Sequence, residues 1–137
     1  MIEANEQAYF DAFVARPESV AVYDALTNEQ FMDVLNADTS GALSQSERDA
    51  LVAELNGGNI TRARALRSVL EDPTFVDSEF RRAFVLMQHF GYLRRDPDAV
   101  GFNFWLTKLN AFGGDFRSAE MVEAFPSSDE YRKRFGR

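Results

Sequence analysis

The sequence has no cysteine, one histidine and one tryptophan. Without cysteine it forms no disulfide, holds no zinc–thiolate or iron–sulfur site and has no cysteine nucleophile. His89, the sole histidine, follows Val85 by four residues and precedes Leu93 by four, so it lies at the edge of an apolar stripe. A general base needs a nucleophile or substrate pocket beside it, and the sequence nominates neither. We therefore predict a structural role for His89.

Long apolar runs are also missing. No segment approaches the roughly 18–20 apolar residues that a membrane span needs. The first residues, MIEANEQ, lack the basic segment followed by an apolar one that marks a signal peptide. We therefore predict no insertion into a membrane, and no signal peptide is recognisable in these residues.

Basic residues are scarce in the first part of the chain. Residues 1–60 hold eleven Asp and Glu against two Arg, a net charge of −9, whereas residues 61–137 hold eleven against thirteen Lys and Arg, a net charge of +2. A chain with a total charge of −7 repels polyanions, so we predict no nucleic-acid partner. The Arg residues of the second part are interpreted as solvated helix faces with local carboxylate pairs.

Signals for helix starts and stops recur along the chain, and no stretch alternates as a strand does. Thr27 with Gln30 and Ser44 with Glu47 form capping boxes, and Gly-Gly pairs end two segments. The sequence therefore predicts an all-α fold of about eight short helices. Further caps are expected at Asn59 or Thr61, Asp72, Asp96, Asp115, and Ser127 or Ser128.

Apolar residues at helical spacing predict the buried face of each helix. The longest helix is expected from Phe75 to Leu93, with a bend near Asp77. Trp105 falls at core spacing, so we expect a mostly buried indole rather than a sugar-stacking one. Gly101 inside a helix suggests a close approach of a second helix. The residues expected to point inward are Phe31, Leu35, Leu55, Leu66, Val69, Phe80, Phe84, Met87, Phe90, Leu93, Phe102, Trp105, Leu109, Met121, Val122 and Phe125.

Two segments of the chain resemble each other. Leu55 matches Leu109 at an offset of 54 residues, and after the Gly-Gly breaks Val69 matches Phe125 at an offset of 56. We interpret the chain as two tandem, similar helical units, at 27–80 (degenerate) and 81–137, preceded at 1–26 by the tail of another unit. Repeated helical units bury their apolar faces against neighbours, so Met1 is expected to begin a fragment of a longer array.

The second unit contains a recognisable pattern of residues around its tryptophan. The pattern consists of Arg95, Asp96, Pro97, Asp98, Gly101, Trp105, Leu109, Phe125, Ser128, Glu130 and Tyr131. With these residues the unit resembles a bacterial family of domains of unknown function, number 4214. The resemblance covers residues 80–135 well and residues 27–80 only through the repeat. It implies a helical fold similar to phycobilisome linker domains, in exported or S-layer proteins, with no known activity.

The segment 36–47 fits the twelve-residue loop of an EF-hand, with glycine at position 6 and glutamate at position 12. Only two of its side chains carry charge, so its affinity for calcium would be low. The alternative interpretation is a turn followed by the Ser44–Glu47 capping box. The calcium ligands in the first interpretation are Asn36, Asp38, Ser40, the carbonyl of Ala42, Ser44 and Glu47.

The residues predict no catalysis. Asp96 and Asp98, in a proline turn beside Arg94 and Arg95, are interpreted as a surface cap network, so a hydrolase that uses Asp and Glu has no support. We expect a non-catalytic interaction module of a bacterial cell-surface or secreted protein, binding a partner protein, like units or a surface glycan. The alternative is a calcium-binding helical domain. No other cofactor is expected.

Overall fold

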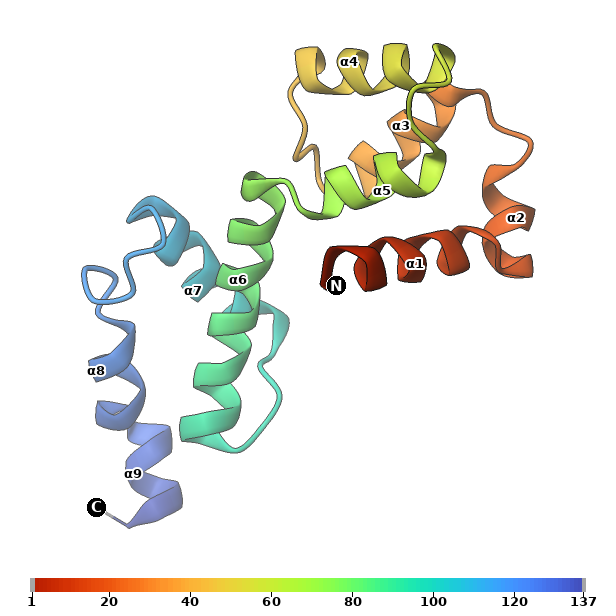
Figure 1. Ribbon diagram of the computed structural model, residues 1–137. Coiled ribbons are helices and arrows are strands. Elements are labelled where there is room, and N and C mark those ends of the chain that lie inside the picture. The colour runs from red at the N-terminus through yellow and green to blue at the C-terminus, as the bar shows by residue number, and fades with distance from the viewer. Residues whose placement is uncertain (1, 137) are drawn as a thin grey trace. The chain divides into compact units, whose positions relative to one another are not determined.

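The chain is helical in the computed structural model, which describes residues 2–136 (Figure 1). Within that range it contains nine α-helices, one π-helical turn, η1, and no strand, so the prediction of an all-α fold is confirmed. The helices are α1 (Ile2–Val14), α2 (Pro17–Tyr23), α3 (Asn28–Asp38), α4 (Gln45–Asn56), α5 (Arg62–Leu70), α6 (Pro73–Gln88), η1 (His89–Leu93), α7 (Ala99–Ala111), α8 (Met121–Ser127) and α9 (Asp129–Phe135). None of these helices has the length and apolar character needed to cross a membrane.

The chain forms two compact units, and the boundary between them along the chain falls between Val76 and Asp77. We call residues 1–76 unit 1 and residues 77–137 unit 2. The repeat predicted boundaries after residues 26 and 80, whereas α1 and α2 belong to the same compact unit as α3, α4 and α5. That residues 1–26 derive from a preceding repeat stays a prediction.

Unit 1 has a core formed by α3, α4 and α5. Phe31 and Met32 of α3 are fully buried, and Val69 of α5 is buried with them. Helix α1 packs along α5, and Phe10 and Phe13 are partly buried against this core. Burial of these large apolar side chains supplies the main stabilisation of the unit.

The predicted helix starts of unit 1 are confirmed. Thr27 and Ser44 each accept a hydrogen bond from the backbone amide three residues on, and Gln30 and Glu47 complete the two capping boxes. Thr61, rather than Asn59, caps α5. These starts were predictable because a capping box depends on residues three positions apart.

Unit 2 has a smaller core centred on Phe125. The ring of His89 meets Phe125 edge-on at a centroid distance of 4.8 Å, and Trp105 lies 5.2 Å from the same ring. His89 is 2% exposed, and its Nδ1 lies 2.9 Å from the carbonyl oxygen of Val85. The histidine and the tryptophan therefore take part in core packing, although Trp105 is partly rather than fully buried.

Helix α6 runs without the bend expected near Asp77. The helix continues to Gln88, and the irregularity comes later, where η1 ends at Arg94 with φ 53°. A residue in this left-handed conformation turns the chain away from the helix axis. The chain then enters the Pro97 turn that leads to α7.

Two expected caps of unit 2 were wrong in position. Asp98, not Asp96, caps α7, because its Oδ1 accepts the amide of Gly101 at 2.8 Å. Asp115 caps a turn through the amide of Arg117, 3.0 Å away, and α8 begins at Met121. For the last helix the cap is Ser128.

The atoms nearest to Gly101 belong to its own helix cap. A Cβ atom at this position would first meet the carboxylate of Asp98, at 3.4–3.7 Å, which is ordinary contact. A close approach of a second helix to Gly101 stays a prediction.

Candidate functional site

The predicted calcium loop takes the form of a capped turn between α3 and α4. Asn36 and Asp38 lie in the last turn of α3, and Ser40 and Gly41 follow with φ 60° and 75°. The side chain of Asn36 is engaged, since its Oδ1 accepts the amide of Leu43 at 2.9 Å and its Nδ2 donates to the same residue's carbonyl at 3.4 Å.

The second half of this loop is held by Glu47. Its Oε2 accepts the amide of Ser44 at 2.8 Å and the Ser44 hydroxyl at 2.5 Å. These hydrogen bonds stabilise the charged carboxylate and lower the pKa of Glu47. Ala42 is partly buried. The contacts suffice for a structural turn; calcium binding by Asn36, Asp38, Ser40, Ala42, Ser44 and Glu47 stays a prediction.

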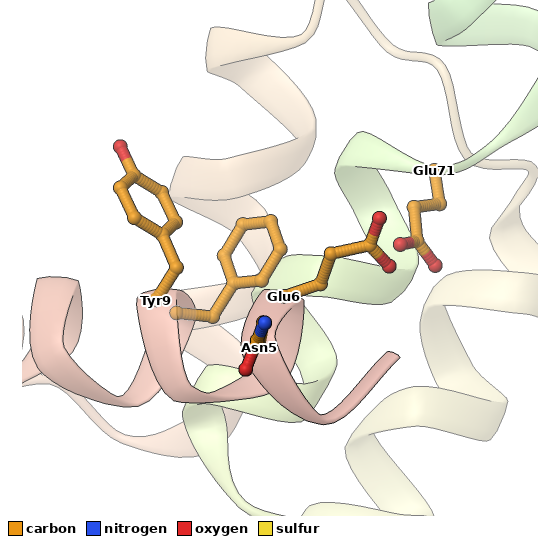
Figure 2. Close-up of a pocket in the computed structure, with 5 residues that line it drawn as sticks. Asn5, Glu6, Tyr9 and Glu71 are labelled. Atoms are coloured by element: carbon orange, nitrogen blue, oxygen red, sulfur yellow. The ribbon is translucent and has the colours of Figure 1, made fainter. Parts of the chain in front are cut away.

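A hollow of about 480 Å³ lies beside α1 in unit 1 (Figure 2). Figure 2 shows Glu6 of α1 turned toward Glu71, with Asn5 and Tyr9 along the same helix. Arg67 joins the two carboxylates, at 2.9 Å from Glu6 and 2.7 Å from Glu71. Because both acids are paired with the same guanidinium, we interpret the group as a tie between α1 and α5.

Arg67 is buried, although the arginines of this part of the chain were expected to lie on solvated helix faces. It is 6% exposed, and its guanidinium also donates to the backbone carbonyl of Glu3 at 3.2 Å. The hydrogen bond to Glu71 raises the pKa of Arg67 above its ordinary value, and nearby acidic charge acts in the same direction. Only the contact with Glu71, four residues on, has a signal in the sequence, because Glu6 lies 61 residues away.

The cap network of unit 2 is centred on Arg95. Its guanidinium binds both carboxylate oxygens of Glu130 in α9, at 2.5 and 2.8 Å, and lies 3.7 Å from Asp98. These contacts lower the pKa of Glu130 and raise the pKa of Arg95. Arg95 thus ties the turn before α7 to the last helix, which the sequence had suggested only for the neighbouring acids.

Unit 2 exposes apolar side chains that were expected to be buried. Phe80 and Met87 of α6 are 63% and 68% exposed, and Phe90 is exposed as well. Val85 and His89, on the other side of the same segment, form the core. The prediction failed because α6 has apolar residues on two faces, and the larger set is the outer one. We call Phe80, Ala83 and Met87 of α6 together with Phe90 of η1, all of them exposed, the α6 stripe.

Helix α7 presents a second apolar face. Val100 is 81% exposed and Phe104 is also exposed, and they border a shallow hollow of about 460 Å³ together with Lys108. Neither residue was predicted to form a face, because the helical spacing of the sequence indicated only the Phe102–Leu109 side of the helix. Their four-residue spacing was the signal that could have revealed them. Val122 of α8 is exposed too, against expectation.

Convergent polar groups are few by comparison. Within residues 2–136 no three His, Asp or Glu side chains gather in a group that could hold a metal ion. The apolar faces of α6 and α7 are therefore the most distinctive surface of unit 2.

One family is identified by comparison with known proteins. The family model described as "Domain of unknown function (DUF4214)" matches residues 77–135. No curated protein matches the chain. No solved structure matches it either. The matched segment begins at the first residue of unit 2 and covers nearly all of it. Residues 77–135 of unit 2 thus match the DUF4214 family.

Proposed function

We propose that the chain is a non-catalytic interaction module, which binds a partner protein, like units or a surface glycan through the apolar faces of unit 2. The observation that carries the proposal is the exposure of Phe80, Met87, Val100 and Phe104. Large apolar patches on soluble proteins commonly mark sites of interaction, because water-exposed apolar surface costs free energy that a partner removes. Location at a bacterial cell surface or in a secreted protein is part of the proposal and rests on the family resemblance.

The two faces suit different partners. The α6 stripe is apolar along three helical turns and suits the apolar face of another protein. The hollow on α7 combines the ring of Phe104 with the polar groups of Asn103, Thr107 and Lys108. A phenyl ring beside hydrogen-bonding groups is the arrangement that a glycan version of the proposal requires.

Photo-crosslinking tests the proposal. A photoreactive phenylalanine analogue would replace Met87 in one variant and Phe104 in another, and Glu54, on the exposed polar side of α4, would be the control position. The variants are irradiated in the source cells, and a glycan array is probed with the same proteins. Adducts or glycan binding that depend on position 87 or 104 support the proposal, and their absence at both positions contradicts it.

A second candidate function is weak calcium binding at residues 36–47. One observation favours it: Gly41 has φ 75° at the position where an EF-hand loop requires a sharp turn. Binding would require Asn36 and Glu47 to leave their present hydrogen bonds with Leu43 and Ser44. Calorimetric titration at millimolar calcium should then show heat that is lost in Glu47→Gln. A flat titration would contradict this second function.

A further inference from the structure

The α6 stripe has the spacing of a helix-pairing seam. Its residues follow one another at intervals of three, four and three, which places apolar side chains in one line along a helix. Phe80 and Met87 are more than half exposed, whereas Val85 and His89 on the other face are almost completely buried. The folding of unit 2 therefore uses the inner face and leaves the stripe without a partner within the unit.

Unit 1 shows that a similar helix does not need an apolar outer face. At the offset of 54, Ala83, Met87 and Phe90 match Glu29, Asp33 and Asn36 of α3. Two inner positions keep their burial at the same offset: Phe31 and Val85 are both fully buried, and Leu35 and His89 are both almost completely buried. A third does not, because fully buried Met32 matches Leu86, which is 37% exposed. The outer positions of α3 are instead polar, and Asp33 forms an ion pair with Arg48 at 2.7 Å.

The sizes of the stripe residues fit an antiparallel pair of identical helices. In a two-fold arrangement centred at Val85, Phe80 of one copy lies opposite Phe90 of the other, and Ala83 lies opposite Met87. A small residue thus faces a large one, as close packing requires. A parallel pair would place Ala83 opposite Ala83 and leave a gap in the middle of the seam.

Charges at the two ends of the stripe favour the same direction. Asp77 and Glu79 flank its first turn, where they pair with Arg81 and Arg82 of the same helix, and Arg94 lies beyond its last residue. Arg94 is exposed, and within residues 2–136 its guanidinium forms no ion pair or hydrogen bond. An antiparallel pair brings Arg94 of each copy toward the carboxylates of Asp77 and Glu79 of the other, whereas a parallel pair would place the two Arg94 side chains next to each other.

We propose that two copies of this chain associate through the α6 stripe, with the two helices antiparallel. The inference rests on the proposed interaction function and names its partner as a second copy. The arrangement is isologous, so each stripe residue is buried once in each copy and the assembly closes as a dimer.

Sedimentation equilibrium of the full chain tests the dimer. The key variant is Ala83→Glu with Met87→Asp and Phe90→Asn, which gives α6 the residues found at the matching positions of α3. We expect a dimer for the natural sequence and a dissociation constant raised by at least about 100-fold in the triple variant, because central apolar contacts dominate such interfaces. The emission of Trp105 and the helical circular dichroism should stay unchanged, since the stripe faces solvent in one copy.

A matched control is Val100→Ser, which likewise gives α7 the residue that unit 1 has at the matching position, Ser46. This variant should dimerise as the natural sequence does. A monomer for the natural sequence at millimolar concentration, or a triple variant that remains dimeric, would overturn the inference. If the dimer is absent, adducts from Met87 or Phe104 to another protein, or glycan binding through Phe104, would still support the proposed function.

The direction of the helices has its own test, because the chain has no natural cysteine. In the variant Phe80→Cys with Phe90→Cys, the antiparallel dimer should give disulfide-linked peptides that join positions 80 and 90 of different copies, because these positions lie directly opposite each other. Peptides that join 80 to 80 and 90 to 90 would show a parallel pair and overturn the proposed arrangement.

Discussion

The outer faces of α3 and α6 differ, although Phe31 of α3 and its match in α6, Val85, are both buried on the inner face. Helix α3 carries Asp33 where α6 carries Met87, and Asp33 is held by Arg48. Phe31 in unit 1 and Val85 in unit 2 are both fully buried. The inner face is therefore set by folding, whereas the outer face is free to differ and carries the proposed interaction.

The two units also differ in what covers α5 of unit 1 and α8, the helix that matches it in unit 2. In unit 1, α1 packs along α5, and Leu66 and Arg67 are buried. At the offset of 56 these residues match Val122 and Glu123 of α8, which are both exposed. Unit 1 thus has more of its surface covered by its own chain, and unit 2 has more available for a partner.

Removing a core side chain from one unit is the strongest way to test whether the two units fold separately. Phe31→Ala should destabilise unit 1 by about 3–5 kcal/mol, because it opens a cavity at a fully buried site. Trp105, the sole tryptophan, reports on unit 2 alone. In urea, circular dichroism should therefore show that unit 1 unfolds at a lower urea concentration. The transition followed by fluorescence should stay at the same urea concentration.

The mirror variant, Val85→Ala, removes two buried methyl groups from unit 2 and should cost roughly 2 kcal/mol. Its effect should appear in the fluorescence transition. If Phe31→Ala shifted the fluorescence transition as much as the circular dichroism, the two units would be one cooperative structure.

Arg67 provides the next largest expected difference between the units. Arg67→Ala removes the hydrogen bonds to Glu6 and Glu71, and should lower the stability of unit 1 by about 2 kcal/mol. The matching change in unit 2, Glu123→Ala, should alter stability by less than about 0.5 kcal/mol because the residue is exposed. Equal effects in urea unfolding would contradict the role of Arg67 as a tie.

Local features of both units were predictable from the sequence, and surface assignments were not. The caps at Thr27, Ser44 and Ser128 depend on neighbours within four residues, so their patterns are readable directly. Whether Phe80 and Met87 are exposed depends on which face of α6 packs in the core of unit 2. Apolar residues on both faces of α6 give no local signal that tells which face is buried.

The candidate sites follow the same division. The Ser44–Glu47 contact was predictable as a capping box, whereas the bonding of Asn36 to Leu43 requires the turn to be folded. Arg95 was expected to pair with nearby acids, but its principal partner, Glu130, lies 35 residues away. Such contacts follow from tertiary packing, which spacing along the chain does not reveal.

Gly101 offers a smaller test of the difference between the caps of α4 and α7. Its counterpart at the offset of 54 is Glu47, a better helix former that completes a capping box. Gly101→Ala should stabilise unit 2 by about 0.5–1 kcal/mol, since a Cβ atom there makes only ordinary contacts. The fluorescence transition in urea measures the change. A loss of stability would mean that the space beside Asp98 is needed.

The smallest expected effect is a pH dependence specific to unit 2. Arg95 lowers the pKa of Glu130 below its usual value of about 4.3, so the folded unit favours the charged carboxylate. This contribution is present above the usual pKa and is lost as the pH falls through the lowered one. It should amount to at most about 1 kcal/mol, because the Glu130 side chain is 38% exposed.

Glu130→Gln isolates this contribution, because glutamine keeps the shape of the side chain and does not titrate. At neutral pH the variant should be slightly less stable by Trp105 fluorescence, and the difference should vanish at a pH well below 4. The unfolding of unit 1, followed by circular dichroism, should not change in this variant. The positions of unit 1 that match Arg95 and Glu130 are Gly41 and Thr74, which form no ion pair. A difference that persisted in acid would show that Glu130 stabilises unit 2 through packing rather than through its charge.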